Sequence, residues 1–544
     1  MDLLVIIERD SLPGVFDEDM KSKVSITVFQ ACLRTALAQE ANGSWNNSVE
    51  ETSYAILILS EARRLCLFEG MQQHLAAAVD SGVSFLSSPA GRSAPPDYIW
   101  IAKVGNTATF LTEAYLLAAL KASTYPPAAT SDVGRKVGIN LSAAKVDMHC
   151  NLLRRTALFS GLPDWQVRSS VVEATLFEPL LRARRLEIFP RPDAQLDKDK
   201  YFDIIPLIWT SCNNRSLTFA STSFIYEMMV ISFLNYQADE FIEAVAGPYF
   251  AGNLDRLGEV VNSLFASSPH VRINDSDEVY APLSRFVSYI LDNPSVVNAS
   301  PWDRGDLKRE LHKFLLGQVA QTEDNARFDR QLQMNTFHAG RTRFFDWVRG
   351  LAADHTGCPY IFAFVQCSLS SSLSKGAECF PTPAQKYFAY VTSRHIATIG
   401  RMDNDFGSVL RDATEGNLNS VNFPEFGVKE MARVHNSSNL KRSADGELVV
   451  NTRKQQLLNL AKYERSCRDD ALIRLEKEAE VGTTGNPALQ RIEKRKMAIW
   501  HMFCSTTELY GQIQSMRDIS SRLLGPQTRL NGNGTRNEIM VDST

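Results

Sequence analysis

The chain has 544 residues, of which 44% are hydrophobic, and its formal net charge is −4. This length predicts two or more domains, and the balanced charge excludes a basic surface for nucleic acid. No uncharged apolar run reaches the roughly 18 residues that a membrane-spanning helix needs, so stable membrane insertion is not expected. Nine cysteines without a C-x-x-C pair, and an N-terminus without a basic leader, favour a reduced cytoplasmic protein.

The N-terminal part begins with a helical pattern, EETSYAILILSEARRL at 50–65, whose Glu pair stands where the helix dipole favours negative charge. A Pro/Ser/Gly-rich stretch at 123–138 then predicts a domain break. Beyond this break the chain alternates helical patterns with polar stretches, and no strand alternation or internal repeat appears. We therefore expect an all-α protein with a helical region at 1–140, a larger helical domain at 141–525 and a disordered tail at 526–544.

An acidic pair follows the longest apolar stretch of the larger domain. The segment 204–236 contains two charged residues, Arg215 and Glu227. Asp239 and Glu243 come next at a spacing of i, i+4, which places both carboxylates on one face of a helix. An acidic pair on a helix is usually a solvated surface, but the apolar run before it is not. The pattern predicts an apolar cavity with an acidic rim.

A second row of oxygen-bearing side chains stands in RMDNDFGSVLRDATEGN (401–417), where Asn404, Ser408 and Asp412 are spaced i, i+4, i+8. It follows another mostly apolar stretch at 388–400. Mg²⁺ binds oxygen ligands and commonly uses one or two carboxylates together with phosphate oxygens. Two helices with such rows predict an enzyme that holds a diphosphate through Mg²⁺ and removes it from carbon.

The second row carries a family resemblance. NDFGSVLRD resembles the second metal motif of class I terpene cyclases, (N/D)Dxx(S/T/G)xxx(E/D), and DEFIE at 239–243 resembles their aspartate-rich motif in a DExxE form. The strings YFDIIPLIWTSCNNRS (201–216), FLNYQADEFIEAV (233–245) and EGNLNSVNFPEF (415–426) resemble the C-terminal, class I half of fungal copalyl diphosphate/ent-kaurene synthases. The resemblance covers 145–525 and implies the α-helical bundle of class I terpene synthases.

The N-terminal region shares this resemblance. Gln39, Gly43 and Trp45 match the QW motif of terpene-cyclase α/α barrels, and 97–123 is similar to the end of the β domain in the fungal enzymes. The resemblance implies that 1–140 is a truncated, β-domain-like barrel remnant whose QW residues pack helices together. The DxDD acid that starts class II cyclisation in the bifunctional relatives is absent from the sequence, so we expect no class II activity.

The resemblance also implies roles for the two rows, with Mg²⁺ as cofactor and a prenyl diphosphate as substrate. Asp239, assisted by Glu243, would hold one side of a Mg²⁺ cluster. Asn404, Ser408 and Asp412 would chelate another ion, and Asp239, Asn404 and Asp412 would be catalytic in this sense.

Two arginines flank the second row. Arg401 and Arg411 stand where relatives place a diphosphate-contacting base, and the planar arginine fork suits phosphate oxygens. A surface salt bridge is the alternative for each, and Arg215 is a weaker third candidate. The polar segment 431–453 is a candidate for a loop that closes over the bound diphosphate.

Aromatic rings are candidates for the cavity wall because their faces stabilise carbocations without trapping them. For each single ring, ordinary core packing is the favoured interpretation, so the rings are named as a pool only. The pool contains Trp209, Phe219, Phe224, Tyr226, Phe233, Trp500 and Phe503. His338 and His395 are expected to be structural.

Three functions remain open at this point. The favoured one is conversion of farnesyl diphosphate to a humulene-type sesquiterpene in secondary metabolism, because the organisation is similar to that of fungal humulene-type synthases. The second is a diterpene synthase acting on geranylgeranyl or copalyl diphosphate, as ent-kaurene synthases do. The third is a catalytically inactive helical interaction protein. An upstream prenyl diphosphate synthase is the expected supplier of substrate.

Overall fold

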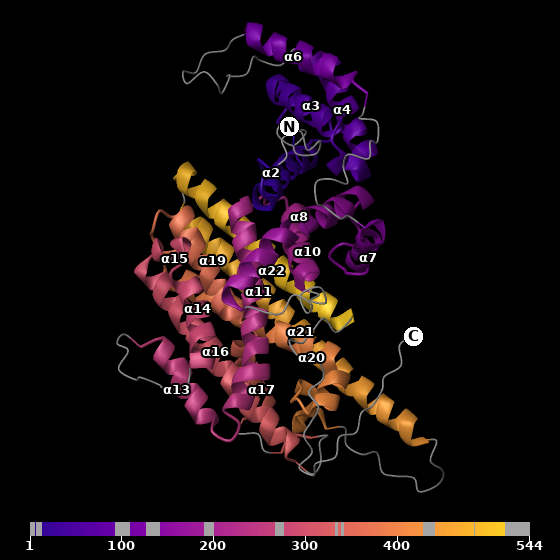
Figure 1. Cartoon of the computed structure of the whole chain (residues 1–544). Helices are drawn as coiled ribbons and strands as arrows, with labels where there is room; N and C mark the ends of the chain where they lie inside the picture. The colour runs from indigo at the N-terminus through magenta and orange to yellow at the C-terminus, as the bar shows by residue number, and fades with distance from the viewer. Residues whose placement is uncertain are drawn as a thin grey trace.

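The computed structural model of the chain is helical throughout the parts that it describes, and no β-sheet forms there (Figure 1). The expected all-α class is confirmed. None of the helices in these parts is long and apolar enough to cross a membrane. The described residues are 6, 14–92, 109–126, 142–189, 201–266, 277–331, 336–338, 342–427, 441–483 and 485–516.

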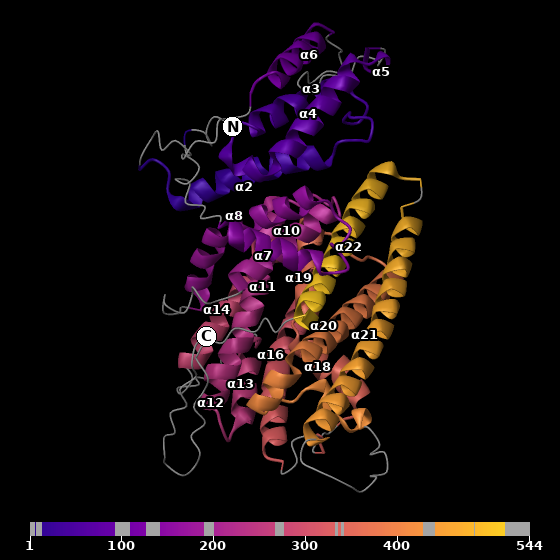
Figure 2. The same ribbon diagram turned by 90° about the vertical axis from the view of Figure 1, so that its right-hand side faces the viewer.

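The N-terminal helices form a layer of their own at one end of the molecule, drawn in indigo in Figures 1 and 2. The indole of Trp45 is buried and donates from Nε1 to the carbonyl oxygen of Thr35 at 2.7 Å, and Gln39 Nε2 donates to the carbonyl oxygens of Gly43 and Ala78. These bonds join chain segments, as expected for the QW residues. The helices are α2 (Glu18–Leu37), α3 (Val49–Ala62), η1 (Cys66–Met71), α4 (Gln72–Ser87), α5 (Pro89–Arg92) and α6 (Thr109–Ser123).

Helix α2 attaches this layer to the rest of the protein through buried polar bonds. Gln30 Nε2 donates to Glu173 Oε1 at 2.7 Å, and its amide oxygen accepts from Thr222 Oγ1. Arg34 Nη2 donates to the carbonyl oxygen of Ala220 at 2.5 Å. Buried polar groups that are satisfied across two segments fix their relative placement. The barrel-remnant assignment for 1–140 itself stays a prediction.

The larger part is a helical bundle around α11, whose residues are buried on nearly every side. Helix α11 packs on α8, α10, α14 and α19, while α20 packs along α21 and α22 (Figure 2). In chain order the helices are α7 (Ala143–Arg154), α8 (Asp164–Ile188), α10 (Tyr201–Arg215), α11 (Thr222–Phe241), η3 (Ile242–Ala246), α12 (Gly247–Tyr249), α13 (Leu254–Leu264), α14 (Asp277–Leu291), α15 (Pro294–Val297), α16 (Pro301–Asp329), α17 (Phe344–Arg349), α18 (Leu351–His355), α19 (Cys358–Ser372), α20 (Pro383–Glu415), η4 (Ser420–Asn422), η5 (Pro424–Phe426), α21 (Lys441–Val481) and α22 (Pro487–Met516).

Helix α20 carries the second oxygen row, and its sequence fixes both of its ends. Thr382 and Gln385 form a reciprocal capping box, and Pro383 occupies the first turn, where its missing N–H costs nothing. Gly416 ends the helix in the left-handed region at φ +75°, which a glycine adopts without strain. The chain then turns back, so that η4 packs against α20 and Phe423 and Phe426 pack against Phe344 of α17.

The expected loop at 431–453 is wrong for its second part. Residues 441–453 belong to α21, a helix that packs along α20, and tertiary packing of a helix routinely overrides a composition that favours a loop. Residues 431–440 lie outside the described part of the chain, as do 127–138 of the expected break and the expected tail at 526–544. The domain boundaries therefore stay predictions.

Helices α20 and α22 cross closely at Gly407, and this contact generates a stability prediction. A Cβ on Gly407 would lie 2.1 Å from the carbonyl oxygen of Gln514, a backbone atom that cannot turn aside. Gly407→Ala should lower the thermal unfolding midpoint, since overpacking costs about 1–3 kcal/mol. The control is Gly258→Ala, because that helical position has nothing within 4 Å and alanine favours a helix over glycine. A Gly407→Ala variant as stable as the Gly258→Ala variant would contradict the close crossing.

Candidate active site

The two predicted rows meet at one polar mouth. Asp239 at the end of α11 and Glu243 in η3 line the same depression as Asn404 and Asp412 of α20. The turn η3 is π-helical and begins at Ile242, directly after the end of α11, so it contains Glu243; such turns are frequent at functional sites. Side chains far apart in the sequence thus face one space.

An apolar cavity adjoins this mouth and shares part of its wall. Asp239, His355, Arg401 and Asn404 border both spaces. The empty space of the cavity, including its opening to solvent, is about 950 Å³. Two rings of the aromatic pool, Trp209 and Phe503, line it, and the other five do not. The predicted combination of an apolar cavity and an acidic rim is therefore present among the described residues.

Burial disfavours the charged forms of two carboxylates of the mouth, Asp239 and Asp412. Desolvation, and then the charge of the neighbouring Glu243, raise the pKa of Asp239 above its usual range, although Arg401 and Arg411 act in the opposite direction. Desolvation also raises the pKa of Asp412. A carboxylate that is costly to keep charged gains most from a nearby cation. The electrostatics of the mouth therefore favour cation binding.

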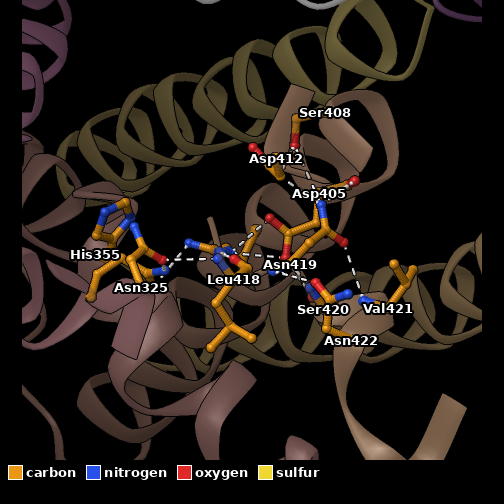
Figure 3. Close-up of polar contacts among 12 residues, drawn as sticks. Asn325, His355, Asp405, Ser408, Asp412, Leu418, Asn419, Ser420, Val421 and Asn422 are labelled. Carbon is orange, nitrogen blue, oxygen red and sulfur yellow. Dashed lines mark hydrogen bonds and ion pairs between the residues drawn. The ribbon is translucent and has the colours of Figure 1, made fainter. Parts of the chain in front are cut away.

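The second row is held in place by hydrogen bonds (Figure 3). Ser408 Oγ donates to Asp412 Oδ2 at 2.6 Å, and Arg411 Nη2 lies 3.3 Å from Asp412 Oδ1. Ser408 is not among the residues that line the mouth, and it reaches the site through this bond. Asp405, between the expected ligands, is buried, and its Oδ2 accepts from the backbone N–H and the hydroxyl of Ser420.

Arg401 is buried and forms hydrogen bonds with several neighbouring segments of the protein. Its Nε donates to Asp405 at 3.0 Å, Nη2 donates to the carbonyl oxygen of Leu418 at 3.1 Å, and Nη1 lies 3.4 Å from Gln321 Oε1. The guanidinium also covers the ring of Trp347 at 4.9 Å. The arginine fork is therefore largely engaged by the protein itself, although it still borders the mouth.

The other two arginines differ from Arg401. Arg411 lines the mouth with 26% of its side chain exposed, so it is the more accessible partner for a diphosphate. Arg215 donates from Nε to the carbonyl oxygen of Leu158 and does not line the mouth. His395 pairs with Glu464 at 2.6 Å, as expected of a structural histidine.

Several residues of the site were not predicted from the sequence. His355 ends α18, and its Nε2 lies 3.4 Å from Asp239 Oδ1; burial lowers its pKa to about 3 and keeps the imidazole neutral. Helix α16 supplies a third wall of the mouth through Gln318, Gln321 and Asn325. Their spacing of i, i+3, i+7 places them on one helical face, a signal that was readable in the sequence but is common on solvated helices.

The donor set suits Mg²⁺ with a phosphate ligand. No group of three His, Cys, Asp or Glu side chains that could hold a metal alone is found in the described parts of the chain. The mouth instead offers Asp, Glu and Asn oxygens from both sides, and the Ser408 hydroxyl lies behind Asp412 and bonds to it. Mg²⁺ typically takes one or two carboxylates and completes its shell with water and phosphate oxygens. These residues therefore fit Mg²⁺ that is bound together with a diphosphate.

Comparison with known proteins agrees with this chemistry. The chain is 38% identical to ent-kaur-16-ene synthase of Fusarium fujikuroi over 96% of its own length. It is 36% identical to phyllocladan-16-alpha-ol synthase of Phomopsis amygdali over 95%, and 36% identical to pimaradiene synthase of Emericella nidulans over 94%. The chain is a homologue of fungal diterpene cyclases. It spans about half the length of these relatives, 53–54%.

The other two comparisons are negative: no protein-family model matches the chain, and no solved structure matches it significantly. The similarity in sequence covers both oxygen rows, because it extends over nearly the whole chain. The humulene-type resemblance receives no support from these relatives.

The contrast between the two arginines gives a prediction. Arg401→Lys should lower both the thermal unfolding midpoint and the activity, because one ammonium cannot replace the bonds to Asp405, Leu418 and Gln321, and each buried group left without its hydrogen bond costs about 1–3 kcal/mol. Arg411→Ala should keep the midpoint but weaken inhibition by inorganic diphosphate. Unfolding scans and inhibition assays check both variants. Wild-type stability of Arg401→Lys with lost activity would instead make Arg401 a direct diphosphate contact.

Proposed function

We propose that the protein is a Mg²⁺-dependent class I terpene cyclase, which ionises a prenyl diphosphate and cyclises the resulting carbocation. The observation that carries this proposal is the shared wall of the polar mouth and the apolar cavity. A diphosphate in the mouth would place its hydrocarbon chain in the cavity. An inactive interaction protein would not need both rows and the cavity together.

The residues of the two oxygen rows would act on the leaving group. Asp239, Glu243, Asn404, Ser408 and Asp412 would hold Mg²⁺, which neutralises charge on a departing diphosphate when bound. Oxygen atoms on two facing helices orient the diphosphate toward the cavity.

Residues at and beyond the mouth complete the reaction. Arg411 would donate to the phosphate oxygens, since charge-assisted bonds to a guanidinium are strong. The apolar cavity excludes water from the cation, and the faces of Trp209 and Phe503 stabilise it electrostatically. The released diphosphate would accept the proton lost in the last step, so no dedicated base is required.

We propose a C20 substrate, geranylgeranyl or copalyl diphosphate, in preference to farnesyl diphosphate. The named relatives are ent-kaurene, phyllocladanol and pimaradiene synthases, and they support the diterpene alternative better than the sesquiterpene interpretation. The given sequence contains no DxDD acid, so we do not expect these 544 residues to form copalyl diphosphate themselves, and that substrate would come from a protonation-initiated cyclase activity outside them. Farnesyl diphosphate remains the second candidate on the organisational similarity alone.

The proposal is tested by supplying C10, C15 and C20 prenyl diphosphates and copalyl diphosphate with Mg²⁺, measuring diphosphate release and analysing the products. We expect release and a cyclic product from a C20 substrate, loss of both with a chelator, and recovery on adding Mg²⁺. Asp239→Ala and Asn404→Ala should each reduce turnover by several orders of magnitude while the helical circular-dichroism spectrum is retained.

A matched control is Asp255→Ala, an acidic side chain in the first turn of α13 that does not line the mouth. It should keep wild-type turnover. Full turnover in the chelator, or wild-type rates in the Asp239→Ala variant, would refute the metal-dependent mechanism. Formation of copalyl diphosphate from geranylgeranyl diphosphate would refute the absence of class II activity.

A further inference from the structure

The segment that follows α20 folds back onto the second oxygen row. Gly416 turns the chain, and Asn419 then packs against α20 with 1% of its surface exposed. Figure 3 shows its side chain beside Asp405, Ser408 and Asp412. Asn419 belongs to neither predicted row, and the chemistry described so far does not use it.

The loop itself determines which end of the Asn419 amide faces α20. The side-chain oxygen Oδ1 accepts the backbone N–H of Val421 at 3.2 Å, while the backbone N–H of Asn419 donates to Asn422 Oδ1 at 3.0 Å. This reciprocal cap opens the turn η4. With the oxygen engaged inside the loop, the amide nitrogen must point toward the helix.

The amide nitrogen joins three groups of the second row. Nδ2 of Asn419 lies 2.8 Å from the carbonyl oxygen of Asp405, 2.8 Å from Asp412 Oδ2 and 3.5 Å from Ser408 Oγ. Asp412 Oδ2 thus accepts from both Ser408 and Asn419. One neutral side chain from another segment therefore sets the orientation of two expected metal ligands.

We propose that Asn419 is a positioning residue that holds Asp412 and Ser408 in the orientation that binds the Mg²⁺–diphosphate unit. The inference rests on the proposed function and deepens it. Groups that orient metal ligands contribute strongly to metal affinity, and their loss typically costs about 10- to 100-fold. A neutral amide suits this task because it donates to the carboxylate without cancelling its charge.

Two variants separate positioning from loop capping. Asn419→Ala removes both the cap and the bonds to α20. Asn419→Ser keeps a short oxygen that can accept the N–H of Val421, but it is too short to bridge to Asp412. Val421→Ala is the matched control, because Val421 is buried in the same turn and its side chain makes no polar contact with the row.

The readout is calorimetric titration with Mg²⁺ in the presence of inorganic diphosphate, which requires no turnover. We expect the half-saturating Mg²⁺ concentration to rise about 10- to 100-fold in Asn419→Ala and Asn419→Ser and to stay at the wild-type value in Val421→Ala. The Asn419→Ser variant should keep a thermal midpoint close to that of the wild type, and its catalytic rate should fall at low Mg²⁺ and recover partly at high Mg²⁺.

The outcomes distinguish the two levels of the proposal. Wild-type Mg²⁺ titration in Asn419→Ser overturns the positioning role and leaves the proposed function intact. A shift in Val421→Ala equal to that in Asn419→Ala also overturns it, since any loosening of the loop would then suffice. Absence of Mg²⁺-dependent diphosphate binding in the wild-type protein overturns both.

Discussion

Carboxylates that face one another in a partly desolvated mouth are the constraint on which the rest of this structure depends. Asp239 and Glu243 come from one side and Asp412 from the other, and burial makes the charged forms of Asp239 and Asp412 costly. Helices that carry such groups repel each other unless contacts on their other faces hold them in place. The bundle therefore needs packing and ion pairs that fix α20 independently of any bound cation.

An adjacent face of α20 supplies that support. Asp403, next to the ligand row, is buried and pairs with Arg465 Nη2 of α21 at 2.5 Å. Arg465 in turn pairs with Glu508 of α22 at 2.9 Å, so one network joins three helices. Gly511 allows this approach, because a Cβ there would lie 2.1 Å from Asp403 Oδ2. Breaking such a buried network typically costs several kcal/mol. The network therefore fixes the position of α20 beside the mouth.

The sequence predicted the helical class and the two oxygen rows because both depend on local spacing. Asp239, Glu243, Asn404 and Asp412 do line one mouth, as their positions on helix faces implied, and their roles in catalysis stay predictions. Of the aromatic pool only Trp209 and Phe503 reach the cavity, since all seven share the composition of core residues and only tertiary packing separates them.

Other features could not be predicted because they depend on how distant segments meet. The Arg401 guanidinium is engaged by hydrogen bonds to Leu418 and Gln321, and no spacing rule connects these residues to it. Asn419 lies in a polar loop whose composition indicates only a turn. His355 borders the mouth because α18 ends there, and a single histidine in the sequence carries no such signal. The chain length of the substrate is set by the shape of the whole cavity, which no single motif specifies.

We propose that both rows bind one diphosphate through shared metal ions. Crystals grown with Mn²⁺, which replaces Mg²⁺ at oxygen sites, and inorganic diphosphate test it by anomalous diffraction. We expect anomalous peaks beside Asp239 and beside Asn404, Ser408 and Asp412, bridged by a single diphosphate at the mouth of the cavity. Peaks at only one row, or a diphosphate bound elsewhere on the protein, would contradict it.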